Sequence, residues 1–143
     1  MVKEIVSKEG ELHFQRYRLL STSRGSIYIH RISKSDLDQH MHDHPWHFKS
    51  LILSGSYSEK TSRYPKFNFS IIEDFKSGDV VKHDARDIHK LTLKTPVVWT
   101  LVLTSGRERI WGYRIAEKPG RGYQKWIDFQ AYRQLKRAGQ LPQ

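Results

Sequence analysis

The chain has 143 residues, of which 37% are hydrophobic, so we expect one domain, residues 1–143, with a single hydrophobic core rather than a disordered protein. It contains no cysteine, which excludes disulfides, thiolate metal ligands and cysteine nucleophiles, so that any metal has to be bound by histidine, by a carboxylate or by a backbone oxygen. The formal net charge of +10 is compatible with nucleic acid or an anionic small molecule as a partner, and equally with a basic surface that has no partner.

The N-terminal stretch, residues 1–14, lacks the apolar core of a signal peptide. No other stretch approaches the roughly 18 apolar residues of a membrane span. We therefore expect a cytoplasmic protein that has no contact with a membrane.

Short strands are predicted along most of the chain. Aromatic and β-branched residues fill segments that are separated by glycine, proline and polar residues typical of turns. In chain order, these segments are residues 12–21, 26–33, 50–64 with a turn at Gly55, 69–75, 79–84, 89–93, 97–104 and 109–115. No helical crossover lies between them, so the pattern predicts an all-β antiparallel sandwich or barrel.

The C-terminal segment has a different pattern, which predicts a helix over about residues 128–138. Apolar residues recur at helical spacing, and Asp128 is suited to cap the first turn. Lysine and arginine occupy the expected last turn, and Gly139 is suited to end the helix. The apolar stripe consists of Phe129, Tyr132 and Leu135.

Four histidines gather in residues 40–48, HMHDHPWHF. If this segment is a strand, side chains two positions apart point the same way, so that His40, His42 and His44 share a face and Asp43 points away. Pro45 favours an edge or a bend at that point. Two imidazoles on an inward face can share one metal ion if a third ligand comes from elsewhere in the chain, and His89 in the segment GDVVKHDARDIHKL is suited to that role.

These two segments resemble the two sequence motifs of the cupin superfamily. HMHDHPWHFKSLILSG is similar to the first motif, and in GDVVKHDARDIH the histidine follows Gly78 by eleven positions, as in the second. The resemblance covers about residues 27–103, and the HDHPW stretch is also similar to small bacterial and phage cupins. It implies a double-stranded β-helix, a jelly-roll barrel followed here by the short C-terminal helix. It also implies a metal ion bound by His42, His44 and His89.

The sequence departs from the cupin pattern where the first motif usually has a glutamate. That position, seven residues before Gly55, is Phe48, and we expect its ring to face the metal. Asp84 and Arg86 replace a proline and a glycine of the second motif. A site with three histidines and no acidic ligand resembles the thiol and diketone dioxygenases among the cupins. The resemblance thus implies an iron-dependent dioxygenase for a small, anionic organic substrate, although zinc, nickel, manganese or copper would also bind to such ligands.

Further residues are candidates for supporting roles. Tyr57 and Glu59 alternate onto one face and are expected to assist proton transfer, and Glu59 is also a candidate ligand, a residue that orients a ligand, or a solvated carboxylate. His40 is either an additional ligand, a residue that orients one, or an exposed loop residue. Candidates for lining the substrate pocket are Tyr28, His30, Phe48, Trp99 and Arg109. For Arg16, Arg18 and Arg107, as for Arg109, a solvated side chain is expected, with an anion-binding role as the alternative. We expect His47 to point outward and His83 to lie on the surface.

Two other functions remain open at this point. One is a cupin-type sugar-nucleotide isomerase or epimerase that uses a His–Tyr or His–Glu pair as acid and base. The other is a non-catalytic module that binds a ligand or nucleic acid, in line with the net charge of +10. A homodimer that pairs through sheet edges is expected only by analogy with many cupins.

Overall fold

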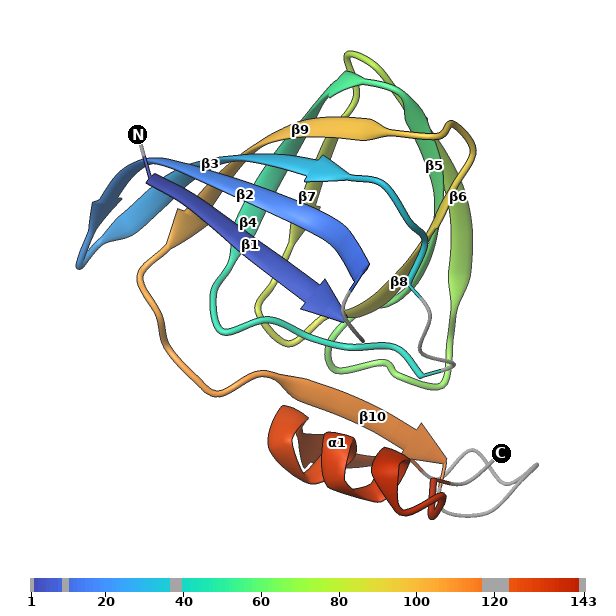
Figure 1. Ribbon diagram of the computed structural model, residues 1–143. Coiled ribbons are helices and arrows are strands. Elements are labelled where there is room, and N and C mark those ends of the chain that lie inside the picture. The colour runs from blue at the N-terminus through green and yellow to red at the C-terminus, as the bar shows by residue number, and fades with distance from the viewer. Residues whose placement is uncertain (1, 9–10, 37–39, 117–123, 142–143) are drawn as a thin grey trace.

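The computed structural model describes residues 2–8, 11–36, 40–116 and 124–141. Its strands form a six-stranded sheet in the order β1-β2-β3-β9-β4-β7, a three-stranded sheet in the order β6-β5-β8, and the separate pair β10-β11 (Figure 1). The elements are β1 (Val2–Lys8), β2 (Glu11–Thr22), β3 (Gly25–Ile32), β4 (Phe48–Ser54), β5 (Ser56–Ser62), β6 (Ile71–Lys76), β7 (Val80–His83), β8 (Ile88–Leu93), β9 (Val98–Ser105), β10 (Gly112–Ala116), β11 (Gln124–Asp128) and α1 (Phe129–Arg137).

The two larger sheets face each other and enclose the core. Side chains alternate in burial along their strands, so that Phe48, Ser50 and Ile52 of β4 point inward. In the opposite, three-stranded sheet, Tyr57 and Glu59 of β5 also point inward. Ile52 and Tyr57 of these two rows form a buried apolar cluster with Val81 and Val98.

The expected all-β architecture is confirmed, with two strands that the pattern did not predict. The expected segments correspond to β2 to β10, and the antiparallel pairing is regular between β3 and β9. The unpredicted strands are β1, which pairs with β2, and β11, which pairs with β10. Both mix apolar and charged residues without the clear alternation that marks a strand with a buried face.

The C-terminal elements pack beside the barrel, where Figure 1 shows β10 and α1 below the two sheets. Helix α1 starts as expected, because the Asp128 carboxylate accepts a hydrogen bond from the Ala131 backbone N–H at 2.9 Å. Tyr132 on α1 is buried and stacks on Tyr113 of β10, with ring centroids 3.7 Å apart. Within the part of the chain that is described, no helix has the length and apolar character needed to cross a membrane.

A buried carboxylate connects these C-terminal elements to the histidine-rich segment. Asp43 is 2% exposed and accepts hydrogen bonds from the Gly112 backbone N–H at 2.7 Å and from Trp126 Nε1 at 2.9 Å. Its other partner is Arg109, whose guanidinium lies 2.7 Å from the carboxylate. Asp43 points away from the neighbouring histidines and fixes the path of their backbone against β10 and β11.

Candidate metal centre

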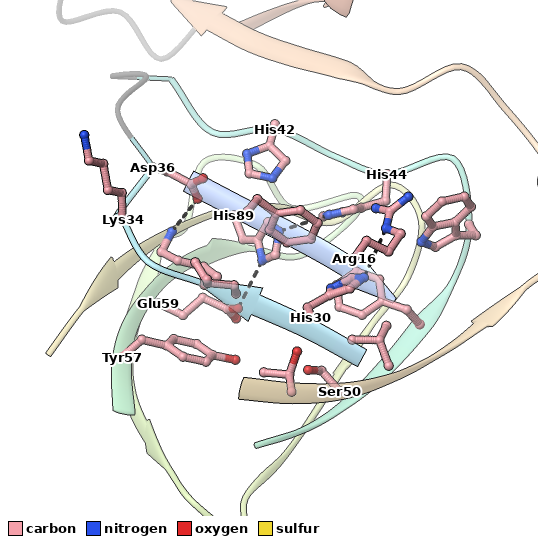
Figure 2. Close-up of a pocket in the computed structure, with 17 residues that line it drawn as sticks. Arg16, His30, Lys34, Asp36, His42, His44, Ser50, Tyr57, Glu59 and His89 are labelled. Carbon is pink, nitrogen blue, oxygen red and sulfur yellow. Dashed lines mark hydrogen bonds and ion pairs between the residues drawn. The ribbon is translucent and has the colours of Figure 1, made fainter. Parts of the chain in front are cut away.

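A cavity of about 140 Å³ lies between the two facing sheets. Figure 2 shows His42, His44 and His89 at its upper wall, with Glu59 and Tyr57 below them. The cavity is smaller than the roughly 300–1,000 Å³ of sites that take drug-sized ligands. It therefore suits a small molecule.

The side chains of His42, His44 and His89 converge on one point. One imidazole nitrogen of each ring lies within 4.8 Å of the others, and the Nε2 atoms of His44 and His89 are 3.4 Å apart. Two nitrogens bound at about 2.0–2.1 Å to one tetrahedral metal ion lie about 3.4 Å from each other. The spacing of these two atoms thus fits a shared metal ion.

His42 and His44 are brought to the cavity by backbone pairing with β8 and with the loop before it, not by a strand of their own. The segment is not a strand, the case for which a shared face of His40, His42 and His44 was argued, but makes bends and isolated bridges only. His42 and His89 exchange two backbone hydrogen bonds, of 3.1 and 2.9 Å, and the His44 N–H donates to the Ala85 carbonyl at 3.1 Å. This pairing brings together ligands from two distant parts of the sequence.

His44 is held in the uncharged form that a metal ligand requires. Burial, followed by the proximity of His89 and His42, lowers the pKa of His44 well below its usual value. Its Nδ1 atom is buried and has no hydrogen-bond partner among the residues that the structure describes. Its environment therefore favours a neutral imidazole, which leaves a lone pair available for coordination.

Glu59 orients His89. Its Oε2 atom lies 3.0 Å from His89 Nδ1, so that the Nδ1–H donates to the carboxylate and Nε2 keeps its lone pair towards His44. Its Oε1 atom accepts from Thr61 Oγ1 at 2.6 Å and lies 2.7 Å from His83 Nε2. Burial opposes the ionisation of Glu59, but the hydrogen bonds from His83 and His89 outweigh it and hold its pKa below the usual range.

His83 is not on the surface as expected, but 3% exposed between two carboxylates. Its Nδ1 lies 3.2 Å from Asp87 and its Nε2 lies beside Glu59. Burial lowers its pKa, but the hydrogen bonds with Asp87 and Glu59 outweigh burial and raise the pKa to about 8. The expectation failed because a lone histidine next to a charged loop shows no sign of the two distant carboxylates that surround it.

A second group of potential ligand atoms, those of Glu59, His83 and His89, also lies within 4.8 Å of one another. A metal ion there would have to displace the proton that His83 shares with two carboxylates. The site of His42, His44 and His89 carries no such cost, because burial keeps His44 neutral. We therefore take the three-histidine group as the candidate metal centre and the Glu59–His83 pair as its support.

The two remaining histidines of the segment lie apart from this group. His40 Nδ1 is 3.1 Å from the Tyr132 hydroxyl of α1, and His40 is outside both groups of potential ligands. His47 is 38% exposed at its side chain and lies 3.0 Å from Glu108, as its expected outward direction implies. It takes no part in the cavity wall.

The candidate pocket residues divide into two groups. Phe48 and His30 line the cavity, and the Phe48 ring centroid is 4.7 Å from that of His44. Tyr28 does not line it but packs behind it against Phe48. Trp99 and Arg109 were expected at the pocket and are not there. Trp99 stacks on Tyr17 on the outer face of β9, and Arg109 is occupied by Asp43.

Among the charged residues of the cavity wall, sequence reasoning missed Lys34 and Asp36. It favoured a solvated side chain for Arg16, with an anion-binding role as the alternative, and Arg16 lines the cavity. The register of β2 against β3 pairs Arg16 with His30, so an inward His30 requires an inward Arg16. That register is a property of the folded sheet, and the sequence carries no clear signal for it.

Comparison with known proteins identifies the fold. No family model and no curated protein sequence matches the chain. Similar solved structures include HppE in its iron(II) form, with a TM-score of 0.59 and 10% identity over 72% of this chain and 55% of HppE. An uncharacterised protein with a double-stranded beta-helix domain from Klebsiella pneumoniae matches with a TM-score of 0.55 and 16% identity. The match covers 80% of this chain and 91% of that protein. A cupin superfamily protein from Desulfitobacterium hafniense matches with a TM-score of 0.52 and 18% identity. The match covers 71% of this chain and 84% of that protein.

These similarities confirm the double-stranded β-helix that the sequence motifs implied. At identities below 25% they concern the fold and leave the activity to be argued from the site. The chain spans only about half the length of HppE, whose 55% coverage leaves much of that protein without a counterpart here.

Proposed function

We propose that this chain, which has the cupin fold, binds one divalent metal ion through His42, His44 and His89 and acts as an iron-dependent dioxygenase on a small organic molecule. The observation that carries the proposal is the convergence of three imidazoles on the wall of the cavity between the two sheets. Similarity to HppE in its iron(II) form supports iron as the metal.

The residues around the histidines keep the ligands fixed and leave room for further ligands at the ion. Iron(II) bound by three neutral imidazoles would supply open positions for substrate and dioxygen. Glu59 holds His89 in the tautomer whose Nε2 can coordinate. Phe48 occupies the position of the usual acidic ligand with an apolar ring, so the chain adds no fourth ligand there.

Tyr57 is suited to donate a hydrogen bond rather than to accept a proton. It is buried and lines the cavity. Burial, together with the negative charges of Glu59 and Asp79, raises the pKa of its phenol. Glu59 already has three hydrogen-bond partners, so we assign hydrogen-bond donation to Tyr57 and orientation of His89 to Glu59.

Metal analysis of the protein loaded with iron(II) under nitrogen tests the first part of the proposal. We expect about one metal ion per chain in the wild type and in the control variant His47→Ala. His42→Ala, His44→Ala and His89→Ala are each expected to lose most of it, because two imidazoles hold a metal ion far more weakly than three. Full metal content in His89→Ala would overturn the assignment of the site.

Oxygen uptake tests the second part. The iron-loaded protein is expected to consume dioxygen in the presence of members of a panel of short thiols, diketones and hydroxy acids, and the metal-free protein is not. A metal-loaded protein that consumes no oxygen with the whole panel would overturn the dioxygenase assignment and leave the metal site standing.

A further inference from the structure

Three hydroxyl groups gather in the cavity below the histidines, each from a different strand. They belong to Ser50 of β4, Tyr57 of β5 and Thr100 of β9, which all line the cavity. Figure 2 shows Ser50 and Tyr57 across the cavity from the three histidines, with their hydroxyl groups turned toward each other. Thr100 lies next to Ser50, because β4 and β9 pair Ser50 with Val102 and Ile52 with Thr100. We call Ser50, Tyr57 and Thr100 the hydroxyl floor.

The three residues are buried, yet their hydroxyl groups are unpaired. The exposed fraction is 6% for Ser50, 3% for Tyr57 and 2% for Thr100. None of the three hydroxyl groups has a hydrogen-bond partner among the residues that the structure describes. None of them is sealed from solvent either, in contrast to Thr104 Oγ1, which is enclosed without a partner. The three hydroxyl groups therefore open into the cavity, where a ligand or water can complete their hydrogen bonds.

The fold itself does not use these hydroxyl groups. The inward side chains next to them on β4 and β9, Ile52, Val98 and Val102, are buried and apolar. Thr61 shows the usual case of a buried hydroxyl, because it is 4% exposed and donates to Glu59 at 2.6 Å. A buried hydroxyl without such a partner costs free energy, since its hydrogen bonds with water are not replaced. A polar floor in this apolar part of the barrel thus points to a ligand.

The hydroxyl floor and the imidazole beside it carry no charge. Thr100 pairs across the sheet with His30, whose Nε2 accepts a hydrogen bond from Arg16 Nε–H at 3.2 Å. Burial, followed by the charge of Arg16, lowers the pKa of His30 to about 3, so its imidazole is neutral at physiological pH. Burial and neighbouring carboxylates raise the pKa of Tyr57, so its phenol stays protonated. The same carboxylates would repel an anion beside the phenol.

From these observations we propose that the hydroxyl floor binds an alcohol group of a small substrate whose other end coordinates the metal. An alcohol both donates and accepts, which suits a site where Tyr57 donates and the hydroxyls of Ser50 and Thr100 can do either. A neutral group also avoids the cost of moving a charge from water into a buried site. The inference rests on the proposed metal centre and specifies the substrate as a short alcohol with a metal-binding group.

Urea denaturation of the metal-free protein tests whether the hydroxyl floor is free of a structural role. Thr100→Val should leave the denaturation midpoint unchanged or raise it, because no hydrogen bond within the protein is lost. Thr61→Val is the matched control, the same substitution at similar burial, and should lower the midpoint because the hydrogen bond to Glu59 is lost. If Thr100→Val lowers the midpoint as much as Thr61→Val, the Thr100 hydroxyl is bonded within the fold and the inference is overturned.

Pairs of thiols that differ only at the far end test the ligand. Protein loaded with cobalt(II) under nitrogen is titrated with 2-mercaptoethanol, 3-mercaptopropan-1-ol and 4-mercaptobutan-1-ol. It is also titrated with propane-, butane- and pentane-1-thiol, in which a methyl group replaces the hydroxyl group. The thiolate-to-cobalt absorption band reports the binding of each thiol. The ratio of the two dissociation constants within a pair measures the preference for the alcohol.

At the chain length that spans the cavity, Ser50→Ala and Thr100→Val should each lower the preference for the alcohol about twofold to tenfold, the contribution of one neutral hydrogen bond. The same variants should bind the alkyl thiol at least as tightly as the wild type, because the hydroxyl floor has become more apolar. Thr92→Val is the control for binding, since Thr92 is exposed on β8 and does not line the cavity. It should keep the preference of the wild type.

The outcomes distinguish this inference from the proposed function. If the wild type binds no cobalt, both are overturned. If it binds cobalt but none of the thiols, or if both floor variants keep the wild-type preference at every chain length, the hydroxyl floor holds water only. The inference is then overturned and the metal centre stands. The cobalt spectrum of each variant without thiol shows whether its metal site is intact, and one of the two floor variants decides the matter if the other does not fold.

Discussion

Glu59 decides which nitrogen of His89 faces the cavity. A neutral imidazole carries one proton, and the carboxylate beside Nδ1 holds that proton there, 3.0 Å away. His83 and Thr61 contact the other carboxylate oxygen, which restricts rotation of the side chain. The orientation of a proposed ligand from β8 thus depends on a residue of β5 that is not one of the three proposed ligands.

We expect Glu59→Gln to weaken metal binding about tenfold to a hundredfold, as is usual when the partner of a ligating histidine is lost. The amide nitrogen of glutamine cannot accept a hydrogen bond, so the variant can accept a hydrogen bond from only one of the two histidines, His83 and His89. A zinc competition titration measures the change. Thr61→Val, which removes one donor to Glu59 but keeps the carboxylate, is the control and should change the affinity much less. Unchanged affinity in Glu59→Gln would contradict the orienting role.

Phe48→Glu is expected to tighten metal binding at least about tenfold, because it adds a carboxylate to the three imidazoles. The Phe48 ring centroid lies 4.7 Å from His44 and 6.0 Å from His89, so a shorter acidic side chain starts within reach of the ion. The same variant should bind azide more weakly in its cobalt form, because the fixed carboxylate competes with exchangeable ligands. Phe48→Leu is the apolar control. A variant with unchanged zinc affinity would remove the support for an open position beside Phe48.

At the level of whole elements, the turns decide how the strands bring the ligands together. Gly55 joins β4 to β5 and Gly78 precedes β7, and both have a positive φ, of 87° and 94°. A Cβ at Gly55 would lie 2.4 Å from the Val97 carbonyl oxygen, whereas a Cβ at Gly78 would meet no atom within 4 Å. At Gly55 a side chain is therefore disfavoured both by the positive φ and by lack of space, and at Gly78 by the positive φ alone.

This difference predicts the cost of two substitutions. Gly78→Ala should lower the free energy of unfolding by about 1–2 kcal/mol, the cost of the left-handed conformation for a residue with a Cβ. Gly55→Ala should cost clearly more, because the backbone of Val97 has to move as well. Urea denaturation of the two metal-free variants measures both values. Equal costs would show that the turn at Gly55 relaxes without disturbing its neighbour.

For the molecule as a whole, the buried neutral imidazole of His30 makes stability depend on pH. Its pKa in the folded protein is about 3, because of burial and then of Arg16, against 6.5 for an unperturbed histidine. Below pH 6.5 the unfolded chain therefore takes up a proton that the folded chain does not, so stability falls as the pH decreases. At pH 5 the loss from this residue is about 2 kcal/mol.

Urea denaturation of the metal-free protein at pH 7 and pH 5 tests this expectation. His30→Gln keeps an acceptor for Arg16 but cannot take up a proton in this range, so it should show a smaller loss between the two pH values than the wild type. Some loss should remain in the variant, because the pKa of His44 is lowered by burial as well. Identical pH dependence in variant and wild type would show that His30 is protonated in the folded protein.

The sequence by itself determined where most strands lie along the chain and how the three histidines are spaced. Alternation of apolar and polar residues is a local property, and glycines such as Gly55 and Gly78 mark turns wherever they occur. The separation of Gly78 and His89 is likewise readable without a structure, and it led to the cupin fold that the structural comparisons confirm. Strands β1 and β11, in which apolar and charged residues do not alternate regularly, carried too weak a pattern to be recognised.

Only the tertiary structure decided which face of each strand lines the cavity. Alternation shows that Trp99 and Thr100 point opposite ways, but the register of β9 between β3 and β4 places Thr100 inside and Trp99 outside, contrary to expectation. Arg16 and His83 were likewise expected outside, and each lies inside because neutralising or aromatic partners come from distant strands. Burial of a charge depends on groups that only closure of the barrel brings together, and a linear sequence does not contain those distances.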